Sequence, residues 1–370
     1  MKVKIGELTK IKTGKLDANA ASEDGQYPFF TCSKEPLRIS TYSYDCECVL
    51  VAGNGDLNVK YYNGKFDAYQ RTYIIEDNGS GKLYMPYLYY FMEGYIEELR
   101  KQAIGGVIKY IKLGNLTDAL IELPSVDEQK SIVEILVKAK GILEKRNDEL
   151  NALDNLIKAR FVEMFGDLAS PECLWNKRKL IEVCVDKDDI KCGPFGTQLS
   201  KDEYMESGIA VWEIPQINTA FKSRPIHFIT SEKAEQLKAY TIISGDIAMS
   251  RKGNVGKCAI FPDNYPAGII HSDVLRIRLN SQLVNPMFMM CQLHFSEAVT
   301  RQIELVSSGA IMAGVNVTKL KQIYVHVPPI ELQNQFADFV RATDKSKVAV
   351  QRALDEAQLL FDSLMQQYFG

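Results

Sequence analysis

The most constraining feature of this 370-residue sequence is an internal repeat. Residues 121–129 read Ile-Glu-Leu-Pro-Ser-Val-Asp-Glu-Gln, and residues 325–333 read Val-His-Val-Pro-Pro-Ile-Glu-Leu-Gln. Both are a short β-like run followed by a proline, a hydrophobe, an acid and a glutamine. The two prolines, Pro124 and Pro328, are 204 positions apart. The chain is therefore predicted to fold as two copies of one unit.

Each copy is predicted to end in a long helix. Proline and the acids that follow it suit a first helical turn, and only Gly141 interrupts the run before Gly166, which the repeat places on Gly370. Apolar residues recur at alternating steps of four and three, the spacing of a coiled-coil seam. The first seam is Ile132, Leu136, Ala139, Leu143, Arg146, Leu150, Leu153, Ile157, Arg160 and Met164. The matching second seam is Phe336, Val340, Thr343, Lys347, Val350, Leu354, Ala357, Phe361, Leu364 and Tyr368.

Helices of about 38 residues rise about 57 Å, longer than a small domain needs. Two such rods with matching seams would bury each other, so we predict an antiparallel, pseudo-twofold pair; the alternative is two unrelated helices, each packed on its own domain. Arg146 and Lys347 interrupt the seam and would fix its register or face another protein. The prediction is an α+β fold with a first globular domain at 1–123, its helix at 124–166, a second globular domain at 167–327 and its helix at 328–370.

Composition narrows the classes of protein further. No apolar run is long enough to span a bilayer, and residues 1–7 lack the apolar core of a signal peptide, so a cytoplasmic protein is expected. The net charge of −3 argues against indiscriminate polyanion binding but allows a local basic face. The eight cysteines and four histidines lack the paired spacing of zinc ligands, apart from the close pair Cys46 and Cys48, so free thiols are expected.

No catalytic constellation is recognisable in the sequence. It has neither a Gly-x-x-x-x-Gly-Lys-Ser/Thr phosphate loop nor a Gly-x-Ser-x-Gly nucleophile elbow. The glycine-rich segment 193–196 contains a proline, which removes an N–H that a phosphate cradle would use. The segment Asn285-Pro286-Met287-Phe288 is similar to the Asn-Pro-Pro-aromatic motif of amino-methyltransferases, but it lacks the second proline and is interpreted as a helix start.

Nucleic-acid binding is better supported, by two turns that follow buried-looking strands. Residues 246–250 run into the turn 251–256, and residues 49–52 run into the turn 53–55. Arginine and lysine hold phosphates, and asparagine and glutamine read adenine edges. The candidates in the second copy are Arg251, Lys252, Asn254 and Lys257, with Gln216, Asn218 and Asn316 as weaker ones. Those in the first copy are Asn54, Asn58 and Lys60, with Tyr61, Tyr62 and Lys65 nearby. The alternative is an ordinary solvated hairpin tip.

The repeat also extends into the globular parts. Residues 105–111 and 309–315 match at the same offset, and Leu116 and Leu320 follow them. A shared scaffold with diverged surfaces is expected if each copy recognises something different.

These motifs together resemble the target-recognition domains of the specificity subunits of type I restriction–modification systems. In the second half the resemblance rests on Trp175, Leu180, Val183, Gly193-Pro194-Phe195-Gly196, Gly245-Asp246-Ile247, the stretch from Arg251 to Lys257, Val327-Pro328-Pro329-Ile330 and Gln333. The first half carries a thinner version in Ile5-Gly6-Glu7-Leu8, Lys12-Thr13-Gly14-Lys15, Tyr27-Pro28-Phe29, Gly53-Asn54-Gly55, Leu123-Pro124 and Gln129. It lacks a tryptophan at its start and an Arg-Lys pair before its turn, so its DNA contacts are harder to assign.

The resemblance implies a subunit that is not itself an enzyme. Each target-recognition domain would read one half of a bipartite site in double-stranded DNA, and the helices would set the gap and dock two methyltransferase subunits. Those partners would bring S-adenosylmethionine and methylate adenine, the chain itself binding no cofactor, and restriction subunits would add cleavage. A gap of about 57 Å corresponds to about 17 base pairs at 3.4 Å each. The alternatives are a coiled-coil scaffold that reads no DNA and a self-sufficient DNA methyltransferase or nuclease.

Overall fold

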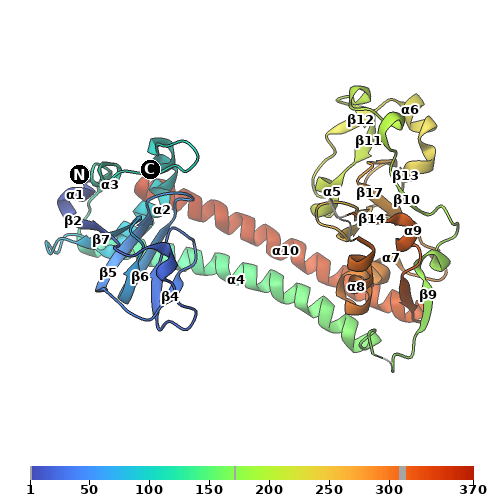
Figure 1. Ribbon diagram of the computed structural model, residues 1–370, viewed down its shortest axis with the longest axis horizontal. Coiled ribbons are helices and arrows are strands. Elements are labelled where there is room, and N and C mark those ends of the chain that lie inside the picture. The colour runs from blue at the N-terminus through green and yellow to red at the C-terminus, as the bar shows by residue number, and fades with distance from the viewer. Residues whose placement is uncertain (1, 171, 308–313) are drawn as a thin grey trace. The chain divides into compact units, whose positions relative to one another are not determined.

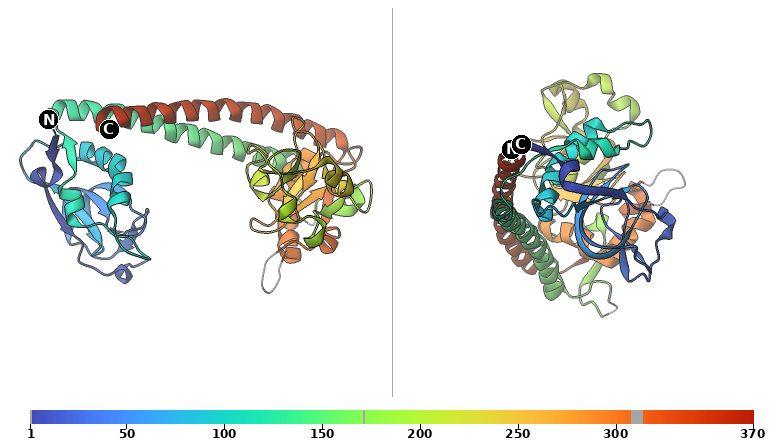
Figure 2. Two further views of the ribbon diagram at one scale, coloured as in Figure 1. Left: turned by 90° about the horizontal axis from the view of Figure 1, so that it is seen from above. Right: turned by 90° about the vertical axis from the view of Figure 1, so that its left-hand side faces the viewer.

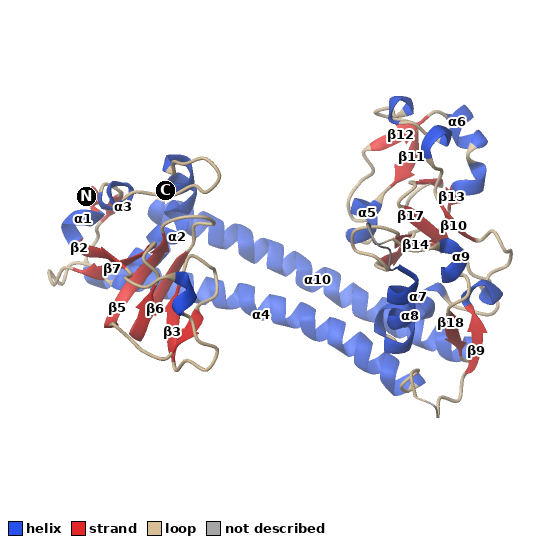
Figure 3. Ribbon diagram, in the orientation of Figure 1, coloured by secondary structure: helices blue, strands red, loops and turns tan. Residues whose placement is uncertain are grey.

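The computed structural model describes residues 2–170, 172–307 and 314–370, and the chain divides into two compact units. The first unit consists of Met1–Asp148 with Val350–Gly370, and the second consists of Glu149–Ala349. Figure 1 labels the elements, and Figure 3 shows that both units mix strands with helices. Each unit combines one globular part with one half of each long helix.

The first unit is built on a six-stranded sheet in the order β2-β7-β5-β6-β3-β4. Its strands are β2 (Thr9–Thr13), β3 (Tyr27–Phe30), β4 (Leu37–Ile39), β5 (Tyr44–Ala52), β6 (Val59–Ala68) and β7 (Thr72–Asp77). A separate antiparallel pair joins β1 (Lys2–Lys4) to β8 (Leu120–Glu122). The helical segments are α1 (Ile5–Leu8), η1 (Ala18–Ala20), α2 (Met85–Gln102) and α3 (Leu113–Thr117).

The described residues of the second unit form three smaller sheets, in the orders β10-β17-β14-β15, β12-β11-β16-β13 and β18-β9. Its strands are β9 (Asn176–Lys179), β10 (Ile190–Cys192), β11 (Ile209–Trp212), β12 (His227–Ile229), β13 (Thr241–Ile242), β14 (Ile247–Ser250), β15 (Cys258–Ile260), β16 (Gly268–Ile270), β17 (Val274–Ile277) and β18 (Tyr324–Val327). Its helical segments are η2 (Leu180–Val183), η3 (Gly196–Gln198), η4 (Lys201–Glu203), α5 (Ile214–Asn218), α6 (Ser231–Gln236), η5 (Lys238–Tyr240), α7 (Pro286–Phe295), α8 (Glu297–Ser307) and α9 (Val317–Leu320).

The two units share one strand topology. The antiparallel order β2-β7-β5-β6 of the first unit recurs as β10-β17-β14-β15 in the second. The parallel pairing of β3 with the end of β6 recurs as that of β11 with β16. The long strands β5 and β6 correspond to broken pairs of strands in the second unit, β13 with β14 and β15 with β16. The repeat predicted from the helices therefore extends through the sheets, although little sequence identity survives there.

The long helices are α4 (Val126–Phe165) and α10 (Ile330–Phe369), each of 40 residues and offset by the predicted 204 positions. They begin two residues after the prolines that we expected in the first turn. In α4 the reason is Ser125, whose hydroxyl accepts from the Glu128 N–H (3.3 Å) while the Glu128 carboxylate accepts from the Ser125 N–H (2.9 Å). This reciprocal cap satisfies two N–H groups at the helix start and lowers the pKa of Glu128 through the Ser125 hydrogen bonds.

The predicted seam is confirmed along both helices, because every seam position is buried or half-buried. Near the globular parts it is fully covered, as at Leu136 in α4 and Phe336 in α10. In the middle it is only half-buried, because two helices alone cannot surround each other's apolar stripe. The seam lysine Lys347 forms an ion pair with Asp154 of α4 at 2.5 Å, which satisfies its charge inside the second unit.

The helices run antiparallel within each unit, as predicted. In the second unit Phe165 and Phe161 pack on Phe336, while Asp154, further back along α4, meets Lys347, further forward along α10. In the first unit the N-terminal half of α4 shares a core with the C-terminal end of α10. Figures 1 and 2 show the helical segments side by side in each unit.

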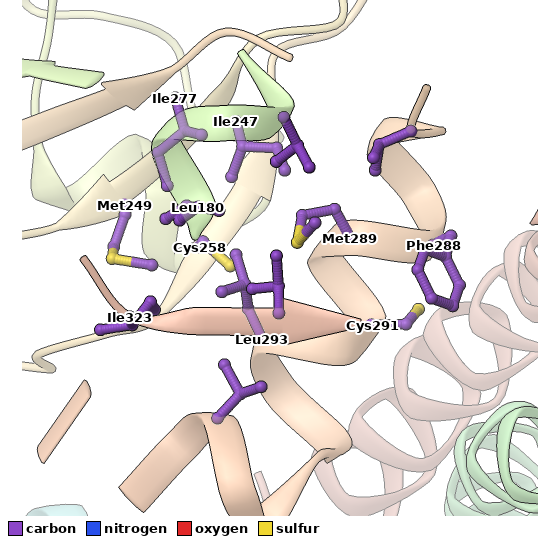
Figure 4. Packing of buried hydrophobic residues seen from close by; sticks show 14 of the residues in the cluster. Leu180, Ile247, Met249, Cys258, Ile277, Phe288, Met289, Cys291, Leu293 and Ile323 are labelled. Atoms are coloured by element: carbon purple, nitrogen blue, oxygen red, sulfur yellow. The ribbon is translucent and has the colours of Figure 1, made fainter. Parts of the chain in front are cut away.

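The main core of the second unit joins the sheet β10-β17-β14-β15 to the helices α7 and α8 and to the long helices. Figure 4 shows Ile247, Met249 and Cys258 from the sheet facing Met289 and Leu293 from α7. The segment 285–288, interpreted from sequence as a helix start, is one: the Asn285 side chain caps α7 by accepting from the Met287 N–H at 2.9 Å. The globular part is therefore fixed on the helices by continuous apolar packing, which positions the loops at the far end of the sheet.

One buried glutamine in each copy ties the first turns of the long helix to the globular part. Gln129 is fully buried; its amide oxygen accepts from the Tyr84 N–H (2.8 Å), and its Nε2 donates to the carbonyls of Lys82 (2.8 Å) and Pro124 (3.0 Å).

Gln333 repeats this pattern in the second unit. Its amide oxygen accepts from the Asn285 N–H (2.9 Å), and its Nε2 donates to the carbonyls of Leu283 (3.2 Å) and Pro328 (2.7 Å). The glutamine that the sequence repeat preserves is therefore a structural clamp between the long helix and the start of α2 or α7.

We expect Gln333→Leu to lower the free energy of unfolding of the second unit by about 2–4 kcal/mol, because a buried N–H and two carbonyls lose their partner at about 1–3 kcal/mol each before relaxation. The two tryptophans of the chain, Trp175 and Trp212, lie in this unit, so tryptophan fluorescence in a denaturant titration measures it directly. The matched control is Gln335→Leu on the exposed face of the same helix, expected to change stability by no more than about 0.5 kcal/mol. Equal effects of the two substitutions would contradict the clamp.

Candidate nucleic-acid interface

The two predicted turns are held by the same set of backbone hydrogen bonds in both units. In the first unit these are Gly53 N to Arg71 O (2.8 Å), Thr72 N to Tyr69 O (2.8 Å) and Ile111 N to Gly53 O (2.9 Å). In the second unit they are Arg251 N to Asp273 O (2.9 Å), Val274 N to His271 O (2.9 Å) and Val315 N to Arg251 O (3.0 Å). We call the loops that these bonds join the loop frame. It comprises residues 14–16, 53–58, 69–71 and 110–111 in the first unit, and 193–195, 251–257, 271–273 and 314–315 in the second.

A glycine allows the loops of each frame to approach closely. Gly14 donates to Thr72 O at 3.0 Å, and Gly193 donates to Val274 O at 3.1 Å. A Cβ atom at Gly14 would lie 2.2 Å from the Ala68 carbonyl oxygen, and one at Gly193 would lie 2.3 Å from that of Ile270. Only glycine fits such a close backbone approach. The predicted match of 309–315 with 105–111 falls mostly on residues 308–313, which lie outside the described residues, but its end at Val315 takes the place that Ile111 takes in the first unit.

In the second unit Arg251 lies at the centre of the frame. Its guanidinium lies 5.0 Å from the centroid of the Phe195 ring, and its Nε donates to Val315 O at 3.3 Å. Phe195 is itself 49% exposed. Stacking on an aromatic face leaves the edge of a guanidinium free to donate. In the described part of the chain the terminal N–H groups of Arg251 have no hydrogen-bond partner, so the side chain is oriented but not fully used.

The other predicted residues of this turn line its exposed surface. The Lys252 ammonium forms an ion pair with Asp273 at 2.8 Å, which fixes the lysine near the end of β14. Asn254 and Lys257 are exposed, and Gly253 and Gly256 adopt the left-handed backbone that the turn requires. The structure thus brings four of the predicted residues together on one loop, with two cations held in place and an amide and a third cation beside them.

The three weaker candidates of the second unit are placed differently. Gln216 is only 2% exposed; it accepts from the Glu213 N–H (3.1 Å) and donates to Arg224 O (3.1 Å), so we leave it out of the interface. Asn218 is half-buried in α5. Asn316 is exposed, and its side chain caps α9 by accepting from the Lys319 N–H at 3.0 Å.

In the first unit the predicted residues form a tighter local network. Asn58 donates to the carbonyls of Cys32 (2.8 Å) and Asp56 (2.9 Å) and accepts from Lys60. Burial lowers the pKa of the Lys60 ammonium, and its hydrogen bond leaves it less available to a phosphate. Asn54 lies on the loop at the end of β5, half-exposed. Our expectation that Lys65 surrounds this turn was wrong, because β6 runs unbroken from Val59 to Ala68 and carries Lys65 to its other end.

Sequence reasoning missed Phe195, Asp273 and Arg71 as members of the loop frames. The glycine-rich segment 193–196 was noticed as a motif of the resemblance and as a phosphate loop to be excluded, but Phe195 was not predicted to orient Arg251. Asp273 and Arg71 lie in connections with no motif of their own, and only the strand pairing brings them to the turns.

The segment from Ile104 to Tyr110, noticed in the sequence only as part of the repeat, forms an exposed loop. Val107 and Ile108 at its tip are 104% and 62% exposed, and the loop joins the frame through Gly55 N to Lys109 O at 3.0 Å.

The described residues contain no group of three or more histidine, cysteine, aspartate or glutamate side chains placed to hold a metal ion. The eight cysteines are free of disulfides, and burial raises the pKa of the Cys46 thiol to about 11. Within the same described ranges, every helix is too short or too polar to cross a membrane.

Comparison with known proteins agrees with this geometry. The family model for the type I restriction modification DNA specificity domain matches residues 1–152 and 174–357, one copy for each half of the chain. The chain therefore belongs to the family of type I restriction–modification DNA specificity proteins, with two specificity domains in tandem. The family model describes a DNA specificity domain and not a catalytic domain, and neither of the two alternative functions finds support.

Individual relatives carry the same description. The chain is 42% identical over 156 residues to the type I restriction enzyme EcoDI specificity subunit of Escherichia coli, a match that covers 42% of this chain and 34% of that protein, about a third of its length. It is 21% identical over 367 residues to the MjaVIII specificity subunit of Methanocaldococcus jannaschii, covering 92% of this chain and 85% of that protein.

Solved structures share the fold. The crystal structure of the S subunit of a type I restriction–modification system from M. genitalium matches with a TM-score of 0.62 at 16% identity, covering 100% of this chain and 96% of that one. A chain solved in work on complex assembly and conformational transition of the type I R-M system matches with a TM-score of 0.58 at 16% identity, covering 100% and 97%.

We expect Gly14→Ala to destabilise the first unit by at least about 2 kcal/mol, because the new methyl group would press into the Ala68 carbonyl and separate the loops of the frame. Thermal unfolding followed by circular dichroism measures the effect. Gly106→Ala is the matched control, since no atom lies within 4 Å of a Cβ at that position. A Gly14→Ala protein as stable as the control would show that the close approach is not required.

Proposed function

We propose that this chain is the DNA-sequence-specificity subunit of a type I restriction–modification complex, and that each unit reads one half of a bipartite site in double-stranded DNA. The observation that carries the proposal is the loop frame: one backbone arrangement occurs twice, and the side chains mounted on it differ. A scaffold kept constant beneath changing polar side chains is what two readers of different base sequences require.

The residues that we propose to contact DNA in the second unit are Arg251, Lys252, Asn254 and Lys257. The guanidinium of Arg251 is oriented by Phe195 and can donate two parallel hydrogen bonds to a guanine edge or hold a phosphate, and the two lysines supply phosphate contacts. Asn254 offers the amide that pairs with an adenine edge. In the first unit Asn54 follows Gly53 as Lys252 follows Arg251, and it offers an amide on the frame.

The long helices are proposed to set the unread gap and to dock two methyltransferase subunits. Exposed apolar side chains on the helices suit a protein partner, among them Val137 (53%), Val348 (60%) and Leu359 (71%). The methyltransferase partner would bring S-adenosylmethionine and carry out adenine methylation, and restriction subunits would join the same assembly for cleavage. A cytoplasmic location follows from this role.

A first test changes the charge of the second frame. We expect Arg251→Ala combined with Lys252→Ala to weaken DNA binding by the complex with its methyltransferase partners about 10- to 100-fold. The slope of log binding constant against log salt should flatten by about one to two, because each lost phosphate contact releases about one counterion fewer. Fluorescence anisotropy with a labelled target duplex at several salt concentrations measures both quantities.

The matched control is Lys177→Ala combined with Arg178→Ala, which removes an adjacent lysine and arginine from the exposed strand β9 of the same unit. It should leave the affinity and the salt slope unchanged. If the Arg251 and Lys252 variant behaves like this control, the turn is not at the DNA.

A second test lengthens the helices. Seven residues inserted after Asp148 in α4 and seven after Ala349 in α10, where the two units meet along the chain, add one heptad to each helix and keep the seam in phase. The added rise is about 10 Å, so the unread gap in the methylated site should grow by about 3 base pairs.

Methylation mapping with a library of duplexes that differ in gap length measures this change. A complex that assembles, methylates and keeps the original gap would contradict the role of the helices in spacing.

A further inference from the structure

The first frame has no counterpart of the Arg251 side chain that the second frame carries at the start of its turn. Gly53 occupies the position of Arg251, as the hydrogen bonds to Arg71 O and Asp273 O show. A Cβ atom at Gly53 would lie 2.4 Å from the Arg71 carbonyl oxygen and 3.0 Å from the Tyr73 ring. This position therefore cannot hold a side chain without moving the frame, and a recognition cation in the first unit must come from another loop.

The loop opposite Gly53 supplies such a cation. Tyr69, Gln70, Arg71 and Thr72 form a tight turn between β6 and β7, closed by Thr72 N to Tyr69 O at 2.8 Å. Its counterpart in the second unit is the turn from His271 to Val274, and Arg71 takes the place of Asp273. The charge at this position is thus reversed between the units, from the acid that holds Lys252 to a guanidinium.

The turn is rigidly mounted, and its two tip side chains are exposed. Tyr69 N donates to Phe30 O (2.9 Å), Gln70 N donates to Leu16 O (2.9 Å), and Arg71 O accepts from Gly53 N. Gln70 and Arg71 are both exposed, and within the described ranges neither side chain has a hydrogen-bond or ion-pair partner. A fixed backbone beneath unused polar side chains favours recognition, because little ordering of the backbone is needed on binding.

We propose that Arg71 is a base-reading residue of the first unit, with Gln70 beside it, and that the turn between β6 and β7 supplies the cation that the turn after β5 lacks. This inference rests on the proposed function and assigns the contact residue that the sequence left open. The ligand is the major-groove edge of duplex DNA: arginine donates in a bidentate manner to guanine, and glutamine pairs with adenine. Asn54, at the position of Lys252, adds a second amide to the same surface.

The test is a panel of duplexes in which each base pair of the target is replaced in turn, bound by the complex of the full chain with its methyltransferase partners. We expect Arg71→Ala to weaken binding of the cognate duplex about 10- to 100-fold and to remove discrimination at one base pair of one half-site. Arg71→Lys keeps the charge but loses the bidentate fork, so it should recover affinity without recovering discrimination. The Arg251 and Lys252 variant should change only the other half-site.

Lys10→Ala, which removes an exposed cation on β2 of the same unit, is the control and should leave the panel unchanged. The assignment is overturned if Arg71→Ala keeps full discrimination at every position. It is also overturned if binding falls equally for all sequences, including unrelated duplexes, because that pattern marks a phosphate contact. A wild-type complex without any sequence preference would contradict the proposed function itself.

Discussion

A single buried amide in each copy connects the long helix to the globular part that carries the loop frame. Gln129 and Gln333 lie near the start of the long helices and bond on both sides, to the chain before the helix and to the loop that opens α2 or α7. A fully buried glutamine with all of these bonds made is rigid, because any other orientation would strand polar atoms in an apolar core. The sheet packs on α2 or α7, so the position of the loop frame on its helix depends on this clamp.

The loop frame, at the other end of the sheet, is also fixed by hydrogen bonds. Its backbone is held by hydrogen bonds that recur in both units, so the positions of its side chains are set by the fold and their identities are free to vary. The second unit mounts Arg251 and Lys252 and stabilises them with Phe195 and Asp273. The first unit mounts Arg71 and Asn54, with Gly53 between them. The side chains on the two loop frames can therefore differ without any change in the packing of the sheets beneath them.

The repeat, the two long helices and their seam could be predicted from the sequence, because helical spacing is local and the offset of 204 is kept without gaps from one end of the helices to the other. The turns after β5 and β14 could be found because strand and glycine patterns are local too. The partners of those turns could not be predicted. Arg71 reaches its turn only because β7 pairs with β5, and Asp273 reaches its turn only because β17 pairs with β14. Gln216 is a residue whose structural role could not be predicted from the sequence. Its amide suggested base recognition, but the side chain is buried and bonds to backbone groups.

We propose that two copies of one frame read two different half-sites across a fixed gap. Methylome sequencing of cells that carry this chain with its methyltransferase partner tests it most directly. We predict a methylated-adenine motif of two short specific parts separated by a constant number of unspecified base pairs, lost when the gene for this chain is deleted. A single uninterrupted motif, or methylation that does not depend on this chain, would contradict the account.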